Sequence, residues 1–215
     1  MKSILFYKED FPMLQQRKIT DTEVTEFAEV FAYYEYGDSE KGMVPYYSGY
    51  PDRTKLVNYL KAMIHTANKI GAIYTTSDKN EGIVIITNTR HPYPNSAIFG
   101  MMFGMVKALG IGGFQDVMKK FQSGGMSLEN KYRKEKKDFV QIELLAIKKE
   151  FQGKGFMRPL VETAFEIADQ EHLPVIISTD AELKKDKYVH LGMSLVNVRD
   201  IAAGSHMYDM VREAK

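Results

Sequence analysis

The spacing of apolar residues changes period several times along the chain, which predicts a protein of mixed helices and strands. Apolar residues that recur every three or four positions predict helices at residues 22–36, 53–70, 96–109, 114–121 and 128–136. Short apolar runs predict strands at residues 2–7, 72–76 and 82–88, and the last two form a hairpin. We expect Gly71 to end the second helix, and the glycine pairs at 112–113 and 124–125 to separate the last three helices.

The last third of the chain has the clearest pattern. It predicts a strand at 139–147, a glycine-bearing loop at 152–157, a helix at 157–171, a strand at 175–179, a helix at 181–191 and a hairpin at 193–201 and 206–212. Pro159 falls in the first turn of its helix, where a missing N–H costs little. The exposed edges of the last hairpin could pair with a second copy, so a homodimer is one expectation.

Composition narrows the class of protein. A chain of 215 residues, 44% hydrophobic and 27% charged, fits one soluble domain. The net charge of +1 gives no global basic field, so we expect no nucleic-acid partner. Because the chain has no Cys, it has no disulfide, zinc–thiolate site or thiol nucleophile. Residues 1–10 lack a signal-peptide core, and no stretch approaches a membrane span in apolar length, so we expect a cytoplasmic protein without a membrane partner.

The segment from the strand at 139–147 into the helix at 157–171 carries the candidate chemistry. The first N–H groups of a helix have no internal partner, and the helix dipole adds positive charge there. Gly153 and Gly155 let the backbone wrap around an anion, which predicts a diphosphate cradle. The segment fits neither a Walker A loop nor a dinucleotide fingerprint, because the residue after Lys154 is Gly and position 158 is Arg. The alternative is that the two glycines only form a turn.

Two blocks of this region resemble the GNAT N-acetyltransferases. Residues 144–155, LLAIKKEFQGKG, resemble the family's acetyl-CoA signature, and Ser178–Thr179 with residues 188–193, YVHLGM, resemble its terminal segment. The resemblance covers residues 139–212 and is closest to the puromycin N-acetyltransferase branch. It implies an α+β (α/β) fold with a central mixed, mostly antiparallel sheet flanked by helices. It also implies one domain over 1–215, with a helical insert at 95–137 between the third and fourth strands.

The resemblance further implies acetyl-CoA as cosubstrate and direct transfer of its acetyl group to a primary amine of a small molecule. Pantetheine would bond to the strand before the loop, and the loop amides would hold the diphosphate. The matching residues are Leu145, Ala146 and Ile147 on the strand, and Gln152, Gly153, Lys154, Gly155, Phe156 and Met157 on the loop. Met157 stands where the family has Gly or Ala, which predicts crowding near the phosphates.

Two residues are candidates for proton transfer. Tyr188 lies four residues before Gly192, where the family places a tyrosine that faces the CoA sulfur, and a phenol stays protonated at neutral pH. The alternative is a packing tyrosine on a short helix. Glu143 is a candidate general base, because a charged residue within an apolar strand needs a reason. By alternation it shares a face with Gln141 and Leu145; the alternative is that this face reaches solvent.

On the acceptor side, Tyr33, Tyr34 and Tyr36 are candidate substrate-binding residues, because aromatic faces beside carboxylates suit a cationic amine. The alternative is ordinary surface packing. No two of the five His have metal-ligand spacing, so no metal is assigned. Two other functions stay open from the sequence: a non-catalytic acyl-CoA-binding or regulatory module on the same fold, and transfer of a longer acyl group.

Overall fold

The computed structural model describes residues 14, 16–37, 52–122, 124–180, 182–202 and 205–215, so the strand predicted at 2–7 lies outside them. Its strands form one six-stranded sheet in the order β1-β2-β3-β4-β6-β5. The strands are β1 (Ile73–Thr75), β2 (Gly82–Asn88), β3 (Val140–Ile147), β4 (Val175–Thr179), β5 (Ser194–Ala202) and β6 (Ser205–Arg212). Every neighbouring pair is antiparallel except β3 and β4, which confirms the predicted mixed, mostly antiparallel sheet.

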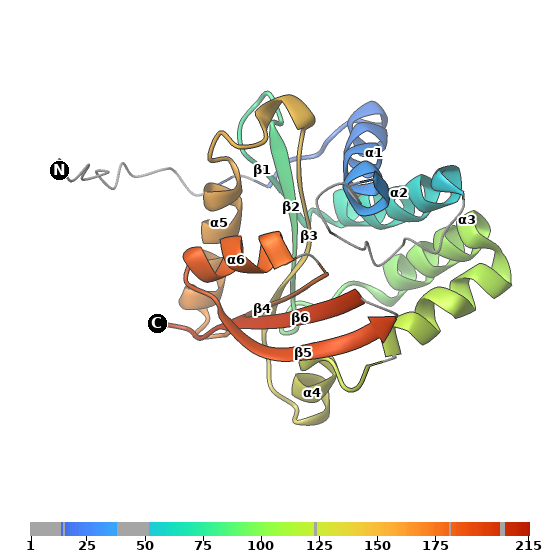
Figure 1. The fold of residues 1–215 in the computed structure, drawn as a ribbon. Helices are drawn as coiled ribbons and strands as arrows, with labels where there is room; N and C mark the ends of the chain where they lie inside the picture. Colours follow the sequence, from blue (N-terminus) through green and yellow to red (C-terminus); the bar gives the residue numbers. More distant parts are fainter. Residues whose placement is uncertain (1–13, 15, 38–51, 123, 181, 203–204) are drawn as a thin grey trace.

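Helices cover both faces of the sheet (Figure 1). They are α1 (Asp21–Gly37), α2 (Arg53–Ile70), α3 (Asn95–Gln122), α4 (Leu128–Lys134), α5 (Met157–Gln170) and α6 (Glu182–His190). One apolar core joins α1, α2 and α3 to the sheet, and a second joins α5 and α6 to its other face. The helices α3 and α4 lie between β2 and β3, where the sequence predicted helices.

Local sequence explains why α2 begins and ends as predicted, at Arg53 and Ile70. The Asp52 carboxylate accepts hydrogen bonds from the Thr54 and Lys55 amides and so caps the helix. Gly71 ends it with a φ of +76°, in the left-handed region that glycine adopts without strain. The buried stripe that includes Leu56, Leu60 and Ile64 packs α2 into the first core.

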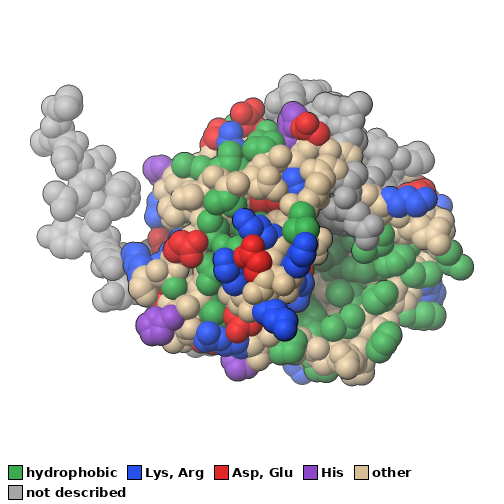
Figure 2. Space-filling view, turned by 90° about the horizontal axis from the view of Figure 1, so that it is seen from below, with side chains coloured by type: hydrophobic (Ala, Val, Ile, Leu, Met, Phe, Trp, Pro, Cys, Tyr) green, Lys and Arg blue, Asp and Glu red, His purple; other side chains and the backbone are tan. Residues whose placement is uncertain are grey.

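Helix α3 differs from the prediction in where it breaks. Gly110 has a φ of +72° and a ψ of 165°, which interrupts the helix there and not at Gly112–Gly113. By length and apolar composition, Asn95–Lys119 could cross a membrane, so the expectation that no stretch approaches a span is wrong by that measure. The break leaves each part shorter than the ~20 residues that a spanning helix needs. Figure 2 shows the exposed apolar side chains of α3 gathered at one edge; they include Phe99, Phe103 and Ile111.

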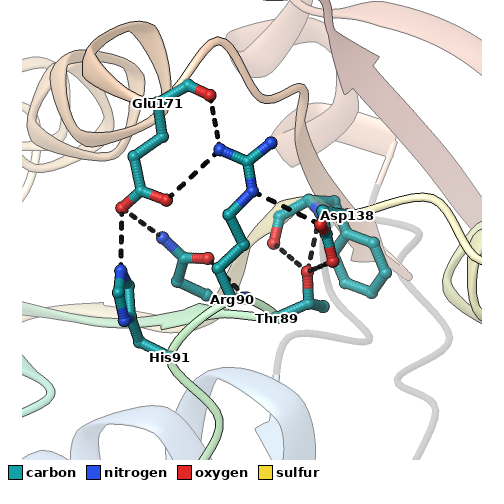
Figure 3. A network of polar contacts seen from close by, with 7 residues as sticks. Thr89, Arg90, His91, Asp138 and Glu171 are labelled. Carbon is teal, nitrogen blue, oxygen red and sulfur yellow. Dashed lines mark hydrogen bonds and ion pairs between the residues drawn. The ribbon is translucent and has the colours of Figure 1, made fainter.

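A polar network joins the end of β2 to the start of β3 and the end of α5 (Figure 3). The Arg90 guanidinium donates to the Glu171 carbonyl at 2.8 Å and to the Asp138 carboxylate at 3.3 Å. The Glu171 carboxylate also accepts from the Asn88 side chain at 2.9 Å and lies 3.3 Å from His91 Nε2. These contacts fix the end of the sheet at which β3 and β4 are still paired.

Candidate active site

The parallel strands β3 and β4 separate soon after they begin. Their pairing consists of Val140 with Val175 and Gln141 with Ile176, and it goes no further. Beyond it, β3 continues to Ile147 beside β2, and β4 continues to Thr179 beside β6. A gap therefore opens toward the carboxyl ends of two adjacent parallel strands, the usual place for a ligand in sheets of this kind. The loop before α5 follows β3, and α6 follows β4, so both lie at the open end.

Beyond its pairing with β4, β3 has an edge whose backbone N–H and C=O groups face the gap. The Lys148 amide donates to the Glu81 carbonyl, so Ala146, two residues earlier, also turns its backbone toward β2. The backbones of Leu145 and Ile147 therefore face the gap. The Ile147 carbonyl accepts a hydrogen bond from the Gln152 side chain at 3.1 Å. Of the three strand residues predicted to contact pantetheine, Leu145 and Ile147 have backbone groups that face the gap, whereas those of Ala146 face β2.

The loop that follows β3 presents consecutive unused amides. None of the N–H groups from Gly153 to Met157 donates a well-formed hydrogen bond to another described residue. Gly153 and Gly155 have φ values of +76° and +88°, which a residue with a Cβ adopts only under strain. Phe156, before the first residue of α5, supplies no side-chain cap to the helix. Amides without partners beside the positive end of a helix dipole are groups that can bind an anion.

Two aromatic rings pack together in this loop, and the Lys154 side chain lies beside one of them. Phe151 and Phe156 stack edge to face with ring centroids 5.7 Å apart, and Lys154 Nζ lies 5.5 Å from the Phe151 centroid. Lys154 has no acidic partner among the residues that the structure describes, whereas Lys148 pairs with Glu26 at 3.0 Å. The Met157 side chain packs against the second core. The Met157 side chain therefore points away from the loop amides, and we expect it not to crowd a bound phosphate.

A β-bulge on β3 determines where Glu143 points. Ile85 pairs with Leu144 and Ile86 pairs with Ile142, so Glu143 is the extra residue between them. Thr87 Oγ1 donates to Glu143 Oε1 at 3.0 Å, and Gln141 Nε2 donates to Oε2 at 3.3 Å. The prediction that Gln141 shares this face is confirmed. The prediction that Leu145 shares it is wrong, because the bulge turns Leu145 toward the second core.

The surroundings of Glu143 favour its neutral form. The Glu143 side chain is exposed to solvent, although many protein atoms lie around its carboxylate. Burial and then the neighbouring Glu129 carboxylate raise the pKa of Glu143 to about 7, against the opposing effects of Thr87 and Arg133. Burial and the Glu143 charge also raise the pKa of Tyr93. A carboxylate with such a pKa can both accept and release a proton at neutral pH.

Tyr188 packs on the face of the sheet opposite to Glu143. It lies on α6 with 4% of its surface exposed, in the second core that also takes in Leu145 and Ile147. Its carbonyl accepts hydrogen bonds from the Leu191 and Met193 amides, which close the turn into β5. The residue is therefore firmly held next to the strand that borders the gap. This placement agrees both with packing and with a hydroxyl aimed at a ligand in the gap.

Several other residues complete the account of the site. The side chains of Tyr33, Tyr34 and Tyr36, on α1, lie outside the described residues. A recess of about 300 Å³, lined in part by Arg90 and Tyr132, lies at the closed end of the sheet, away from the gap. Among the described residues, no group of three or more His, Cys, Asp or Glu could hold a metal ion.

Sequence reasoning placed Gln141 beside Glu143 but missed Thr87 and Glu129. Thr87 comes from β2, Gln141 from β3 and Glu129 from α4, and the 3.4 Å contact from Gln141 Nε2 to Glu129 Oε2 joins elements 12 residues apart. The available signal was the charge at 143 itself, since a carboxylate on a packed strand requires donors around it.

Several solved structures with a similar fold are acetyltransferases. An N-acetyltransferase from Staphylococcus aureus Mu50 is 9% identical, with a TM-score of 0.52 over 94% of this chain and 100% of that one. A Drosophila melanogaster polyamine N-acetyltransferase, which catalyses the formation of N-acetylagmatine, is 13% identical, with a TM-score of 0.55 over 92% and 98%. An agmatine N-acetyltransferase variant in its apo form is also 13% identical, with a TM-score of 0.55 over 93% and 98%.

No family model and no curated protein matches the sequence. The likeness therefore rests on the overall fold, which matches over more than nine tenths of each chain. From this agreement in architecture, we conclude that the chain has the fold of the GNAT acetyltransferases.

Proposed function

We propose that this chain is an acetyl-CoA-dependent N-acetyltransferase that moves an acetyl group directly to a primary amine of a small molecule. The observation that carries the proposal is the row of unused amides from Gly153 to Met157 at the mouth of the gap between β3 and β4. The fold supports acetyl transfer in general, and the acceptors named for similar structures, polyamines and agmatine, are small amines.

The residues at the gap fit coenzyme A by their donor chemistry. The amides of the loop and the free Lys154 ammonium would hold the diphosphate. The Leu145 backbone and the Ile147 amide would bond to the pantetheine amides as a short extra strand. When bound, the thioester supplies an activated acyl group, so the chain needs no nucleophile of its own.

The protein's own part of the reaction is to move two protons. Primary amines are protonated at neutral pH, with a reference pKa of about 10.4 for Lys, so the acceptor must lose a proton before it reacts. Glu143, with its pKa raised to about 7, can take that proton directly or through a water. As the C–N bond forms and the C–S bond breaks, the Tyr188 hydroxyl would give its proton to the leaving sulfur and regain one from the nitrogen, which loses its second proton as the amide forms. The two side chains lie on opposite faces of the sheet, as a base and an acid acting from two sides would.

Calorimetry and a thiol-release assay test the proposal. Titration with acetyl-CoA should show binding at one site, and Lys154→Ala should weaken it by roughly three- to tenfold, more at low salt than at high salt. Lys134→Ala, an exposed lysine on α4, is the matched control. Because the chain has no Cys, CoA released with each amine of a panel can be measured by a thiol reagent without background from the protein.

The outcomes separate the functions left open by the sequence. Failure to bind any CoA ester would overturn the proposal. Binding without turnover on any amine would instead favour a non-catalytic acyl-CoA-binding module. Faster turnover with longer acyl-CoAs than with acetyl-CoA would make the chain a longer-chain acyltransferase.

A further inference from the structure

The carboxylate of Glu143 is held by a chain of polar contacts that leads away from the gap. Gln141 Nε2 lies between two carboxylates, 3.3 Å from Glu143 Oε2 and 3.4 Å from Glu129 Oε2. Glu129 Oε1 in turn accepts from Arg133 Nε at 2.9 Å, one turn later on α4. Both oxygens of Glu143 therefore have a donor, and one of those donors is shared with a second acid.

The orientation of the Gln141 amide supports a specific role. Its Oε1 atom is buried and has no hydrogen-bond partner among the described residues, while its Nε2 faces the two acids. A buried amide oxygen without a partner costs free energy, so the donor end is turned toward the carboxylates at the expense of the acceptor end. This arrangement fits a residue that orients Glu143.

Helix α4 is itself fixed beside the sheet, which keeps Glu129 in place. The Leu128 amide, in the first turn of α4, donates to the Asp209 carboxylate at 3.2 Å. Ser127 caps the same turn by accepting from the Asn130 amide at 3.2 Å. Leu128 and Tyr132 pack with Phe139, which precedes β3, and with Ile176 of β4. Glu129 therefore projects from a turn anchored at both backbone and side chain.

We propose that Glu129 and Gln141 are positioning residues for Glu143: Gln141 donates a hydrogen bond that orients its carboxylate, and Glu129 shares that donor and places a second negative charge nearby. This inference rests on the proposed function, in which Glu143 accepts the proton of the amine. The charged and titratable groups that face Glu143 are Glu129 and Arg133 from α4 and Tyr93 from the segment after β2.

Substitutions at the two residues should move the titration of Glu143 in opposite directions. Glu129→Gln removes the like charge, so the pKa of Glu143 and the acid limb of kcat/KM should fall by roughly one pH unit. Gln141→Leu removes a donor to the charged form, so both should rise, and kcat should fall as the carboxylate loses its orientation. Arg133→Gln, which removes a cation that faces Glu143, should also raise both.

Two readouts keep the test decisive. The first is the pH profile of kcat/KM, and the second is an NMR titration of glutamate side chains labelled with ¹³C, in which Glu143→Gln identifies the resonance of Glu143. Glu135→Gln is the matched control, because it makes the same change at the end of α4, where Glu135 pairs with Lys137. If Glu129→Gln shifts neither readout beyond this control, Glu129 has no positioning role. If wild-type protein has no turnover, the proposed function fails, and the NMR titration still decides the role of Glu129.

Discussion

The Asp209 carboxylate and the Arg199 guanidinium form a buried ion pair, with Arg199 Nε 3.0 Å from Asp209 Oδ2 and only 0% and 4% of the two side chains exposed. Asp209 also accepts hydrogen bonds from the side chains of Ser178 and Asn197 and from the Leu128 amide. One carboxylate on β6 thus joins β4, β5 and α4.

Removal of this carboxylate should destabilise the whole domain. Asp209→Ala leaves the Arg199 charge buried without its main partner, so we expect the free energy of unfolding to fall by about 3–5 kcal/mol. Urea denaturation at pH 7 measures the loss. Asp78→Ala, which removes an exposed partner of Arg17, should leave the midpoint nearly unchanged. Equal midpoints for the two variants would contradict the central role of Asp209.

The loop glycines should matter for backbone geometry and for cofactor affinity. Gly155 has a φ of +88°, and a Cβ there would meet no atom within 4 Å, so Gly155→Ala adds strain without a clash. We expect a loss of about 1–2 kcal/mol in stability, and a weaker affinity for acetyl-CoA by calorimetry because the amides turn away.

Gly112→Ala is the matched control for the loop glycine. This residue also has open space around its Cβ position, but it lies within α3 and has no positive φ. Alanine should therefore stabilise the protein by roughly 0.5–1 kcal/mol and leave acetyl-CoA affinity unchanged. A Gly155→Ala protein as stable as wild type would show that the loop can adopt another conformation.

Loss of the Tyr188 hydroxyl should affect turnover more than binding. Tyr188→Phe keeps the buried ring and removes only the proton donor, so we expect kcat to fall by about 100-fold or more. The dissociation constant of acetyl-CoA, measured by calorimetry, should change far less. An unchanged kcat would remove Tyr188 from the mechanism and leave it a packing residue.

The raised pKa of Glu143 predicts how activity depends on pH. As a base, the group works when it is deprotonated, so kcat/KM should fall as the pH drops below about 7. Glu143→Gln should remove this limb together with most of the activity. A wild-type profile that stays flat from pH 8 to pH 5.5 would rule out Glu143 as the base.

The same pKa predicts an effect on stability of opposite sign to that on activity. A carboxyl whose pKa is higher in the folded state binds more protons there, so its contribution to stability falls as the pH rises from 4.5 to about 7. Glu143→Gln should therefore raise the melting temperature at pH 8, and the gain should shrink as the pH falls toward 4.5. Thermal unfolding at several pH values measures it, and a lower melting temperature at pH 8 would contradict the assignment.

Much of the fold could be predicted from the sequence, because helix caps, apolar stripes and glycine turns depend on residues that are close together in the chain. The bounds of α2 follow from its Asp52 cap, its apolar stripe and Gly71, all readable within the segment. The break of α3 at Gly110 could not be read, since several glycines in the helix offer the same freedom and tertiary packing selects one of them. The glycine loop could be predicted because an anion site of this kind is made from contiguous residues.

The surroundings of the candidate base could not be predicted in the same way. Thr87 and Glu129 come to Glu143 and its neighbour Gln141 from separate elements, and their spacing in sequence carries no sign of it. The bulge at Glu143 also cannot be recognised from the spacing of apolar residues in the sequence. A strict alternation of side chains along β3 therefore placed Leu145 on the wrong face. Arg199 and Asp209 did leave a trace, as charges within the apolar strands of the last hairpin.

The extra residue in β3 has a consequence for how this chain can change. Val140 and Ile142 pack into the core beneath α5, whereas Leu144 and Ala146, which continue the same even-numbered series, pack into the core beneath α1 and α2. The extra residue therefore changes which face of the sheet the even-numbered residues occupy, between the first and the second half of β3. Substitution of Glu143 by another amino acid would preserve that shift. Deletion of residue 143 would instead move the side chains of half of the strand to the opposite face of the sheet. A variant in which residue 143 is deleted should therefore be insoluble. A variant with another residue at position 143 should fold but have lower activity.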